Sequence, residues 1–152
     1  MRIGIADTTF SRVDMGQAAI DTIKKADSKM QIERYTVPGF KDLPVACKIL
    51  SEKYHCDLIL ALGWVGKERV DEVCAHEANQ GLIQAELMVD KHILKIFFHE
   101  KETSNLKEQK KIALERARKH VLNALALLKG KETLTKSAGH GKRQGIADAG
   151  RI

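Results

Sequence analysis

Short apolar runs alternate with longer segments of helical periodicity along most of the chain. The clearest run, DLILAL at residues 57–62, is apolar at nearly every position, which is typical of a strand buried on both faces. The β-favouring stretch YTV at residues 35–37 is ended by Pro38 and Gly39. The pattern predicts strands at residues 2–7, 31–37, 57–62 and 92–98.

Helical segments follow each of these runs. Asp14 is placed to cap the first helix, and Asp42 marks the start of the second, because Pro44 is tolerated in a first turn. The third and fourth helices are expected at residues 70–89 and 105–128. Their expected stripes are Val73, Glu77, Leu82, Ala85 and Leu87 in the third, and Ile112, Leu114, Ala117, Val121, Leu122, Leu125 and Leu128 in the fourth.

The strict alternation of strand and helix predicts an α/β fold. Consecutive strands joined by helices pair in parallel, and the helices then cover both faces of the sheet. We therefore expect one three-layer domain with a four-stranded parallel sheet at residues 1–129. Residues 130–152 hold five of the eleven glycines and several basic side chains, so they are expected to form a Gly-rich basic tail. Such a tail is either mobile or ordered against the ligand of a neighbouring subunit, for which Arg143 and Gln144 are candidates.

Composition narrows the class of protein. The 152 residues are 43% hydrophobic and 30% charged, and a chain of this size needs no metal or disulfide to fold. Three Cys without a CxxC pair fit a cytoplasmic protein, and no apolar run approaches the roughly 20 residues that cross a bilayer. The net charge of +6 fits either nucleic acid or a polar small substrate, but aromatics are only 5% and RNA-binding spacings are absent from the sequence. We therefore expect neither a nucleic-acid nor a membrane partner.

Chemically useful side chains gather where the predicted strands end. In an open parallel sheet, ligands bind beyond the carboxyl ends of the strands. The four exits, at residues 7–10, 37–42, 63–67 and 98–100, supply hydroxyls, carboxylates, lysines, a histidine, the only Trp and several Phe. This set suits a flat heteroaromatic ring with a polyhydroxyl chain. Neither GxGxxG nor GxxxxGK[ST] occurs, so Gly63 and Gly66 are interpreted as turn glycines rather than a phosphate loop.

Motifs at this rim resemble a known family. The stretches VPGFKDLPVA and ALGWVGKERVDEVCAHEANQGL resemble the lumazine synthase superfamily, and the match is closer to its archaeal type of riboflavin synthase. IADTTFSRVDM, LPVACK, CAHEA, the HIxxxFxHE strand exit and the terminal GxRQGxxDAG are similar to that type in order. Two departures separate the chain from lumazine synthase. Lys41 stands where that enzyme has a Phe that stacks on the ring. The catalytic His of that enzyme aligns near Val70 and Asp71, where this chain has no His.

The resemblance implies a fold, a reaction and an assembly. The fold is flavodoxin-like, and the reaction is the dismutation of two 6,7-dimethyl-8-ribityllumazine molecules to riboflavin and 5-amino-6-ribitylaminopyrimidinedione. One lumazine donates a four-carbon unit to the other, so the enzyme is a transferase that needs no organic cofactor. A homopentamer with sites between subunits is implied, and a divalent cation such as Mg²⁺ is a family-level expectation only.

The resemblance also assigns roles to rim residues, each beside a plainer alternative. Lys41 and Lys67 are expected to stabilise the anion formed when a lumazine methyl group loses a proton, and His99 is expected to carry a proton. The alternatives are solvated lysines and a structural histidine. No HxxxH or HExxH spacing occurs, so no metal ligand is assigned.

Substrate binding is expected of a larger set. Asp42 aligns with the carboxylate that binds the ribityl chain, with a helix cap as its second use, and Phe10 and Trp64 are expected to stack on the rings unless they are core residues. Leu94 is a candidate contributed across subunits. The full set is Thr9, Phe10, Pro38, Gly39, Phe40, Asp42, Trp64, His76, Glu77 and Leu94.

Two rival functions stay open. A lumazine synthase would condense the pyrimidinedione with a four-carbon phosphate. A non-enzymatic flavin or lumazine carrier would bind the ring without turnover, and the fold would permit it.

Overall fold

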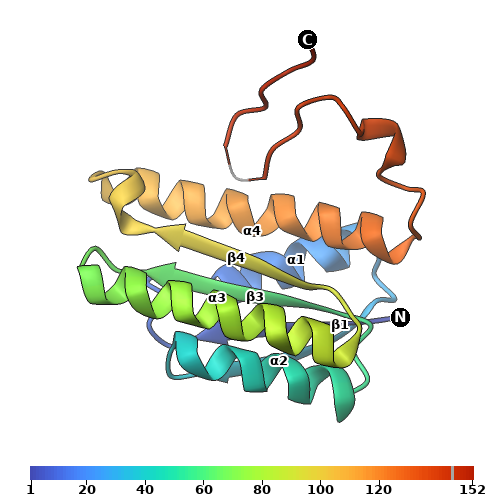
Figure 1. Ribbon diagram of the computed structural model, residues 1–152, viewed down its shortest axis with the longest axis horizontal. Coiled ribbons are helices and arrows are strands. Elements are labelled where there is room, and N and C mark those ends of the chain that lie inside the picture. The colour runs from blue at the N-terminus through green and yellow to red at the C-terminus, as the bar shows by residue number, and fades with distance from the viewer. Residues whose placement is uncertain (145) are drawn as a thin grey trace.

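The computed structural model describes residues 1–144 and 146–152, and its core is a four-stranded parallel sheet. The strands lie in the order β2-β1-β3-β4, as expected for an α/β fold (Figure 1). The chain passes through β1 (Arg2–Thr8), α1 (Met15–Ala26), β2 (Gln31–Val37), α2 (Leu43–Glu52), β3 (Leu58–Val65), α3 (Arg69–Val89), β4 (Ile93–His99) and α4 (Leu106–Leu128). Short 3₁₀ turns at Phe40–Asp42 and Glu100–Glu102 follow β2 and β4.

Helices cover both faces of the sheet and complete three layers. The pair α2 and α3 packs on one face, and the pair α1 and α4 packs on the other (Figure 1). Alternate residues of β3 face opposite sides, so Ile59 joins the core under α2 and α3 while Leu60 joins the core under α1 and α4. All eight residues of β3 are buried, which explains why its sequence is apolar throughout.

Local capping fixes where the helices begin. The side chain of Asp14 accepts a hydrogen bond of 2.8 Å from the backbone N–H of Gln17, as the sequence predicts. Asn105 caps α4 by accepting from the N–H groups of Lys107 and Glu108. Asp42 precedes α2 but makes no capping hydrogen bond with the described residues, so the expected cap is not formed.

The expected stripe of α3 is wrong at three positions, because Val73, Glu77 and Leu87 are exposed. Val73 and Leu87 are 47% and 78% exposed, and the buried positions are Ala75, Ala78, Leu82 and Ala85. Small side chains allow α3 to lie close to α2, and a Cβ at Gly81 would come within 2.8 Å of Pro44 Cγ. The larger apolar side chains are therefore left on the outer face of α3.

The stripe of α4 also differs from the prediction. Leu122 is exposed, while the polar residues Gln109, Arg116 and His120 are buried between apolar neighbours. His120 Nδ1 lies 2.8 Å from the carbonyl oxygen of Arg116, and burial lowers the pKa of His120. A pattern of apolar residues alone does not reveal a buried face that carries three polar side chains.

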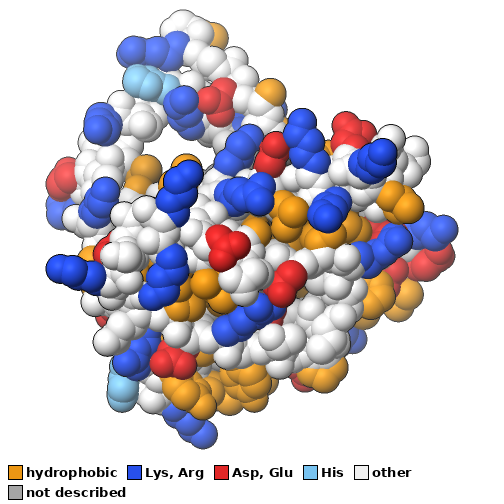
Figure 2. Space-filling model, turned by 180° about the vertical axis from the view of Figure 1, so that it is seen from behind, with side chains coloured by type: hydrophobic (Ala, Val, Ile, Leu, Met, Phe, Trp, Pro, Cys, Tyr) orange, Lys and Arg blue, Asp and Glu red, His pale blue; other side chains and the backbone are white. Residues whose placement is uncertain are grey.

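The segment after α4 runs as irregular chain with one 3₁₀ turn, Thr135–Ser137, and folds back beside α4 (Figure 1). The side chain of Gln144 bonds to His120. The predicted boundary at residue 130 stays a prediction, and Gly145 of the proposed tail lies outside the described residues. Figure 2 shows basic and acidic side chains interspersed on the face seen from behind. Among the described residues, no helix is both long and apolar enough to cross a bilayer.

Candidate functional site

A cavity of about 320 Å³ opens at the carboxyl ends of β1 and β2, on the side of the sheet that α2 and α3 cover. This cavity is called the ring pocket below. It is lined by Phe10, Pro38, Gly39, Phe40, Lys41, Asp42, Asp71 and Cys74. Six of these eight residues belong to the expected set, so the structure brings together one compact part of the predicted rim.

Two bonds tie the β1 exit to the β2 exit. The backbone N–H of Thr9 donates to the carbonyl of Val37 at 2.9 Å, and Thr9 Oγ1 donates to the carbonyl of Pro38 at 3.3 Å. Thr9 therefore acts as a brace beside the pocket. The following residue, Phe10, is 49% exposed and presents its ring to the cavity.

Phe40 forms the inner wall of the ring pocket. Its ring is buried and lies 4.9 Å from the ring of Phe97 in a tilted arrangement. A Cβ at Gly63 would overlap Phe40 Cε1 and lie 2.9 Å from Phe97 Cδ1. Gly63 is part of β3, so its interpretation as a turn glycine is wrong: the position needs glycine to admit the aromatic pair.

Gly66, which follows β3, also leaves no space for a Cβ. A Cβ there would overlap Asp71 Oδ2 and lie 3.4 Å from Phe10 Cζ. The backbone of Gly66 thus lies between a carboxylate and the exposed aromatic ring. Asp71 and Cys74 are pocket residues that the strand exits do not predict, although the spacing of α3 places both on the face of its first two turns that looks toward the β exits.

The two carboxylates of the ring pocket are held differently. Asp42 is exposed and has no hydrogen bond to the start of α2, so its oxygens are available to hydroxyl groups. Asp71 is half-buried, and its Oδ2 accepts from the N–H of Glu68 at 3.1 Å in a reciprocal capping box. Asp42 is therefore free to adapt, whereas Asp71 has a fixed orientation.

Lys41 is the only lysine that lines the ring pocket, as far as the described residues show. Its Nζ lies 2.8 Å from Glu77 Oε2, and this hydrogen bond and its charge raise the pKa of Lys41. Lys41 therefore supplies a permanent positive charge and not a base. Glu77 acts here through Lys41, while His76 and Lys67 are exposed and do not line the pocket.

His99 lies apart from the ring pocket, at the end of the edge strand β4. Its backbone N–H donates to Glu102 Oε1 at 3.0 Å, and its side chain accepts from the N–H of Glu102. Both Glu102 oxygens bond to Arg116 at 2.5 Å. Burial favours a raised pKa for Glu102, but the bonds from Arg116 and His99 outweigh it and lower the pKa.

Trp64 and Leu94 face the other side of the sheet. Trp64 is 2% exposed, its ring lies 4.6 Å from that of Phe98, and its Nε1 donates to Glu100 Oε1 at 2.7 Å. The expected stacking of Trp64 on a ligand is therefore corrected, because its ring is core. Leu94 is the second residue of β4, at the opposite end of the sheet, and packs toward α1 and α4. Within one chain it does not reach the ring pocket.

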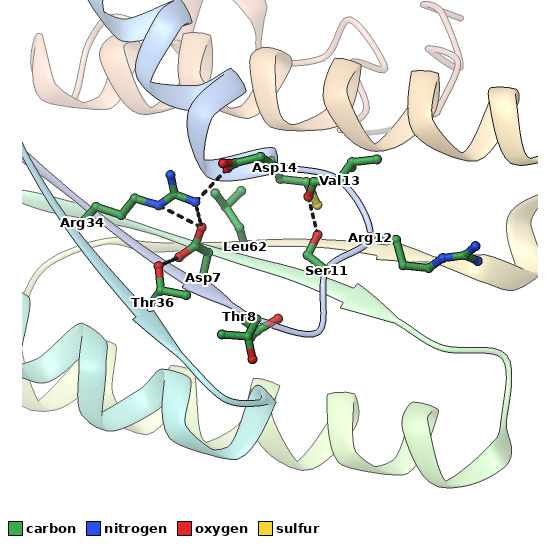
Figure 3. Close-up of a pocket in the computed structure, with 11 residues that line it drawn as sticks. Asp7, Thr8, Ser11, Arg12, Val13, Asp14, Arg34, Thr36 and Leu62 are labelled. Carbon is green, nitrogen blue, oxygen red and sulfur yellow. Dashed lines mark hydrogen bonds and ion pairs between the residues drawn. The ribbon is translucent and has the colours of Figure 1, made fainter.

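A second cavity, of about 270 Å³, lies beside the first turn of α1 (Figure 3). Asp7 is buried there and accepts from Arg34 Nη2 at 2.5 Å and from Thr36 Oγ1 at 2.6 Å, while Arg34 also reaches Asp14 at 2.7 Å. Burial favours a lowered pKa for Arg34, but its two carboxylate partners outweigh it and raise the pKa. A Cβ at Gly16 would overlap Asp7 Oδ2. These paired charges join β1, β2 and α1, and so brace the loop that carries Phe10.

No metal cluster emerges from the structure as described. Within residues 1–144 and 146–152, no group of three His, Cys, Asp or Glu side chains is arranged to hold a metal ion. Cys47 and Cys56 are buried free thiols, and burial raises the pKa of Cys47 to about 12 and that of Cys56 to about 11. These two thiols are therefore unreactive core residues.

The fold and the pocket define a three-layer α/β protein with a cavity beyond the carboxyl ends of its strands. Comparison with known proteins agrees with this class and identifies the family within it. The family model described as 6,7-dimethyl-8-ribityllumazine synthase matches residues 1–132. The chain belongs to this family.

Similar proteins named riboflavin synthase occur in three archaea. The protein of Methanothermobacter thermautotrophicus is 52% identical over 99% of this chain and 98% of its own length. Those of Archaeoglobus fulgidus and Aeropyrum pernix are 47% and 45% identical, over 100% and 99% of this chain and 99% and 97% of their own lengths. Among solved structures, a de novo designed Rossmann fold protein covers 77% of this chain and 98% of its own at 14% identity with a TM-score of 0.40, too distant to bear on the argument.

Proposed function

We propose that this chain is a riboflavin synthase that converts two 6,7-dimethyl-8-ribityllumazine molecules into riboflavin and 5-amino-6-ribitylaminopyrimidinedione. The observation that carries the proposal is the ring pocket, in which an exposed aromatic ring, an uncommitted carboxylate and a fixed cation meet at one strand edge. Full-length similarity to three proteins named riboflavin synthase supports the same reaction.

Each pocket group suits one part of such a substrate. The Phe10 face is large, apolar and exposed, so a flat bicyclic ring stacks on it with offset geometry. The Asp42 carboxylate accepts hydrogen bonds from the hydroxyls of a ribityl chain. The Lys41 ammonium, held by Glu77, favours an anionic ring over a neutral one.

The chemistry needs two rings in contact. One lumazine loses a proton from its 7-methyl group, the resulting carbanion adds to the second ring, and fragmentation of the adduct transfers four carbons. The acceptor becomes riboflavin and the donor leaves as the pyrimidinedione. One molecule is oxidised and the other reduced, so we propose that no organic cofactor takes part, with a divalent cation such as Mg²⁺ as an optional addition. Alignment of two bound rings supplies a high effective concentration, worth up to about 7–11 kcal/mol in ideal cases.

We further propose that the site is completed by a second copy of the chain in a homopentamer. The outer face of α3 exposes Val70, Val73, Ile83, Leu87 and Met88, which is more apolar surface than an isolated helix face usually leaves in water. The ring pocket and His99 lie at different exits of the same sheet edge. A neighbouring copy packed on this side brings the His99 edge of one subunit toward the ring pocket of the next. Light scattering with Leu87→Asp and Val73→Asp variants tests the assembly, which is expected to dissociate.

Localisation in the cytoplasm is part of the proposal. The two buried cysteines remain thiols in the structure, which fits a reducing compartment. The small polar substrates also require no contact with a membrane or nucleic acid.

Purified protein supplied with 6,7-dimethyl-8-ribityllumazine alone tests the reaction. We expect one riboflavin to appear for every two lumazines consumed. The riboflavin absorbance band measures its formation. Formation of lumazine from the pyrimidinedione and a four-carbon phosphate, without riboflavin, would instead support a lumazine synthase. Binding without turnover would support a carrier.

A further inference from the structure

We propose that the Asp71 carboxylate is the base that accepts the 7-methyl proton of the acceptor lumazine, whose carbanion then adds to the donor ring. The inference rests on the proposed function and adds to it a catalytic residue outside the set expected from the strand exits. Its basis is the position of Asp71 in the ring pocket, its fixed orientation and its approach to Phe10.

The titratable groups of the ring pocket leave few choices of base. Four of the described lining residues can titrate: Lys41, Asp42, Asp71 and Cys74. Lys41 is held as a cation by Glu77, which raises the pKa of its ammonium group. His99, the expected proton carrier, is turned toward the backbone of Glu102 at another exit. The two aspartates are the remaining oxygen bases that line the pocket.

The two aspartates differ in how firmly they are held. Asp42 follows a 3₁₀ turn on the exposed rim and has no capping bond, so it can adjust to a flexible polyol. Asp71 belongs to the first turn of α3, and one of its oxygens is fixed by the Glu68 N–H. The structure gives the other oxygen, Oδ1, no protein partner among the described residues. A base that acts on a C–H bond gains from such a fixed orientation, because its lone pair must point at the proton.

Asp71 is also adjacent to the surface on which a ring would stack. Asp71 Oδ2 and Phe10 Cζ flank the same point above Gly66. A bicyclic ring stacked on Phe10 therefore places its edge beside the Asp71 carboxylate. In this arrangement the methyl C–H bond breaks, the electron pair is delocalised over the ring, and the proton goes to Asp71 Oδ1. The Lys41 charge at the same pocket stabilises the anion that results.

Asp71→Asn separates proton transfer from structure. The amide oxygen of Asn still accepts from Glu68 N–H, so the capping bond is retained, but the side chain no longer takes a proton at neutral pH. Glu72→Gln is the matched control, because Glu72 is the next carboxylate in the same helical turn and pairs with Lys101 at 2.9 Å outside the pocket. Three quantities are measured for wild type and both variants: riboflavin formation, affinity for 6,7-dimethyl-8-ribityllumazine, and loss of its 7-methyl proton signal in D₂O.

We expect Asp71→Asn to lower kcat by about 10²–10⁴-fold, the usual contribution of a general base. Its methyl exchange should fall to the rate without protein, while its affinity and melting temperature stay close to those of Glu72→Gln. Riboflavin formation or methyl exchange within threefold of wild type would overturn the proposal, as would a loss of affinity that matches the loss of rate. If wild type makes no riboflavin, the proposed function fails. Methyl exchange in D₂O then still decides the role of Asp71. Wild type should accelerate the exchange, and Asp71→Asn should not.

Discussion

The two ends of the sheet's carboxyl edge are built in opposite ways. At the exits of β1 and β2, Phe10 is half exposed and Asp42 lacks a capping bond. At the exits of β3 and β4, Trp64, Glu100 and Glu102 are joined to Arg116 and Arg12 through charged or polar hydrogen bonds. The first end has unsatisfied groups that a ligand can use, and the second has satisfied groups that hold the edge in place. Exposed groups and paired groups are thus divided between neighbouring strand exits.

The largest expected effect comes from breaking the rigid end. Arg116→Met removes the guanidinium of a side chain that is 9% exposed, and so takes a hydrogen-bond donor from Glu102 and from the Phe97 carbonyl. We expect the free energy of unfolding to fall by about 3 kcal/mol, as for other buried ion pairs that lose one member. Urea denaturation measures it. Lys48→Met, which breaks the exposed pair with Glu52, is the control and should change stability by less than about 0.5 kcal/mol. Equal losses in both variants would show that the two pairs do not differ.

A somewhat smaller effect is expected where the ring pocket meets the core. Gly63→Ala introduces a Cβ that overlaps Phe40 and displaces it from Phe97. We expect a loss of about 1–3 kcal/mol by overpacking, measured by thermal and urea unfolding, together with weaker lumazine binding. Gly39→Ala is the matched change, because a Cβ there has no described atom within 4 Å. A Gly63→Ala variant as stable as Gly39→Ala would contradict the proposed wall.

The open end should affect binding rather than stability. Asp42→Asn removes the charge that we propose receives the ribityl hydroxyls, and we expect KM for lumazine to rise about tenfold, equivalent to about 1.4 kcal/mol. Its unfolding midpoint should not move, since the side chain makes no capping bond. Asp14→Asn provides the contrast, because it weakens the Arg34 ion pair without touching the ring pocket. Unchanged KM in Asp42→Asn would remove Asp42 from the binding site.

The smallest effect is a pH dependence of the rigid end. Glu102 has a folded-state pKa below its usual 4.5, so it stabilises the fold above that value and loses this contribution as the pH falls through the lowered pKa. The stability difference between wild type and Glu102→Gln should therefore be largest at neutral pH and shrink in acid. Urea titrations over this range measure it. A stability difference between the two proteins that grows in acid would contradict a lowered pKa for Glu102.

The elements and the ring pocket differ in how far the sequence predicts them. Strand positions and the cap at Asp14 depend on neighbours in sequence, so local pattern predicts them correctly. Six residues of the ring pocket could be expected because they follow β1 and β2, and parallel pairing brings the ends of these strands together.

Other features depend on contacts that pattern does not contain. Arg116 is buried because Glu102, 14 positions earlier, reaches it across the β4 exit. Trp64 is core because the alternation of β3 turns it toward Phe98, while the close packing of α3 through alanines leaves Leu87 outside. Asp71 has the spacing of a capping-box residue, and its place in a pocket appears only with Gly66 and Phe10 beside it.

A crystal structure with an unreactive lumazine analogue tests the central claim most directly. The account predicts a ring stacked on Phe10, with its ribityl chain at Asp42 and a second ring in contact with the first. A ring bound instead in the cavity between Asp7 and Arg34, or a lone ring with no space for a second, would contradict it.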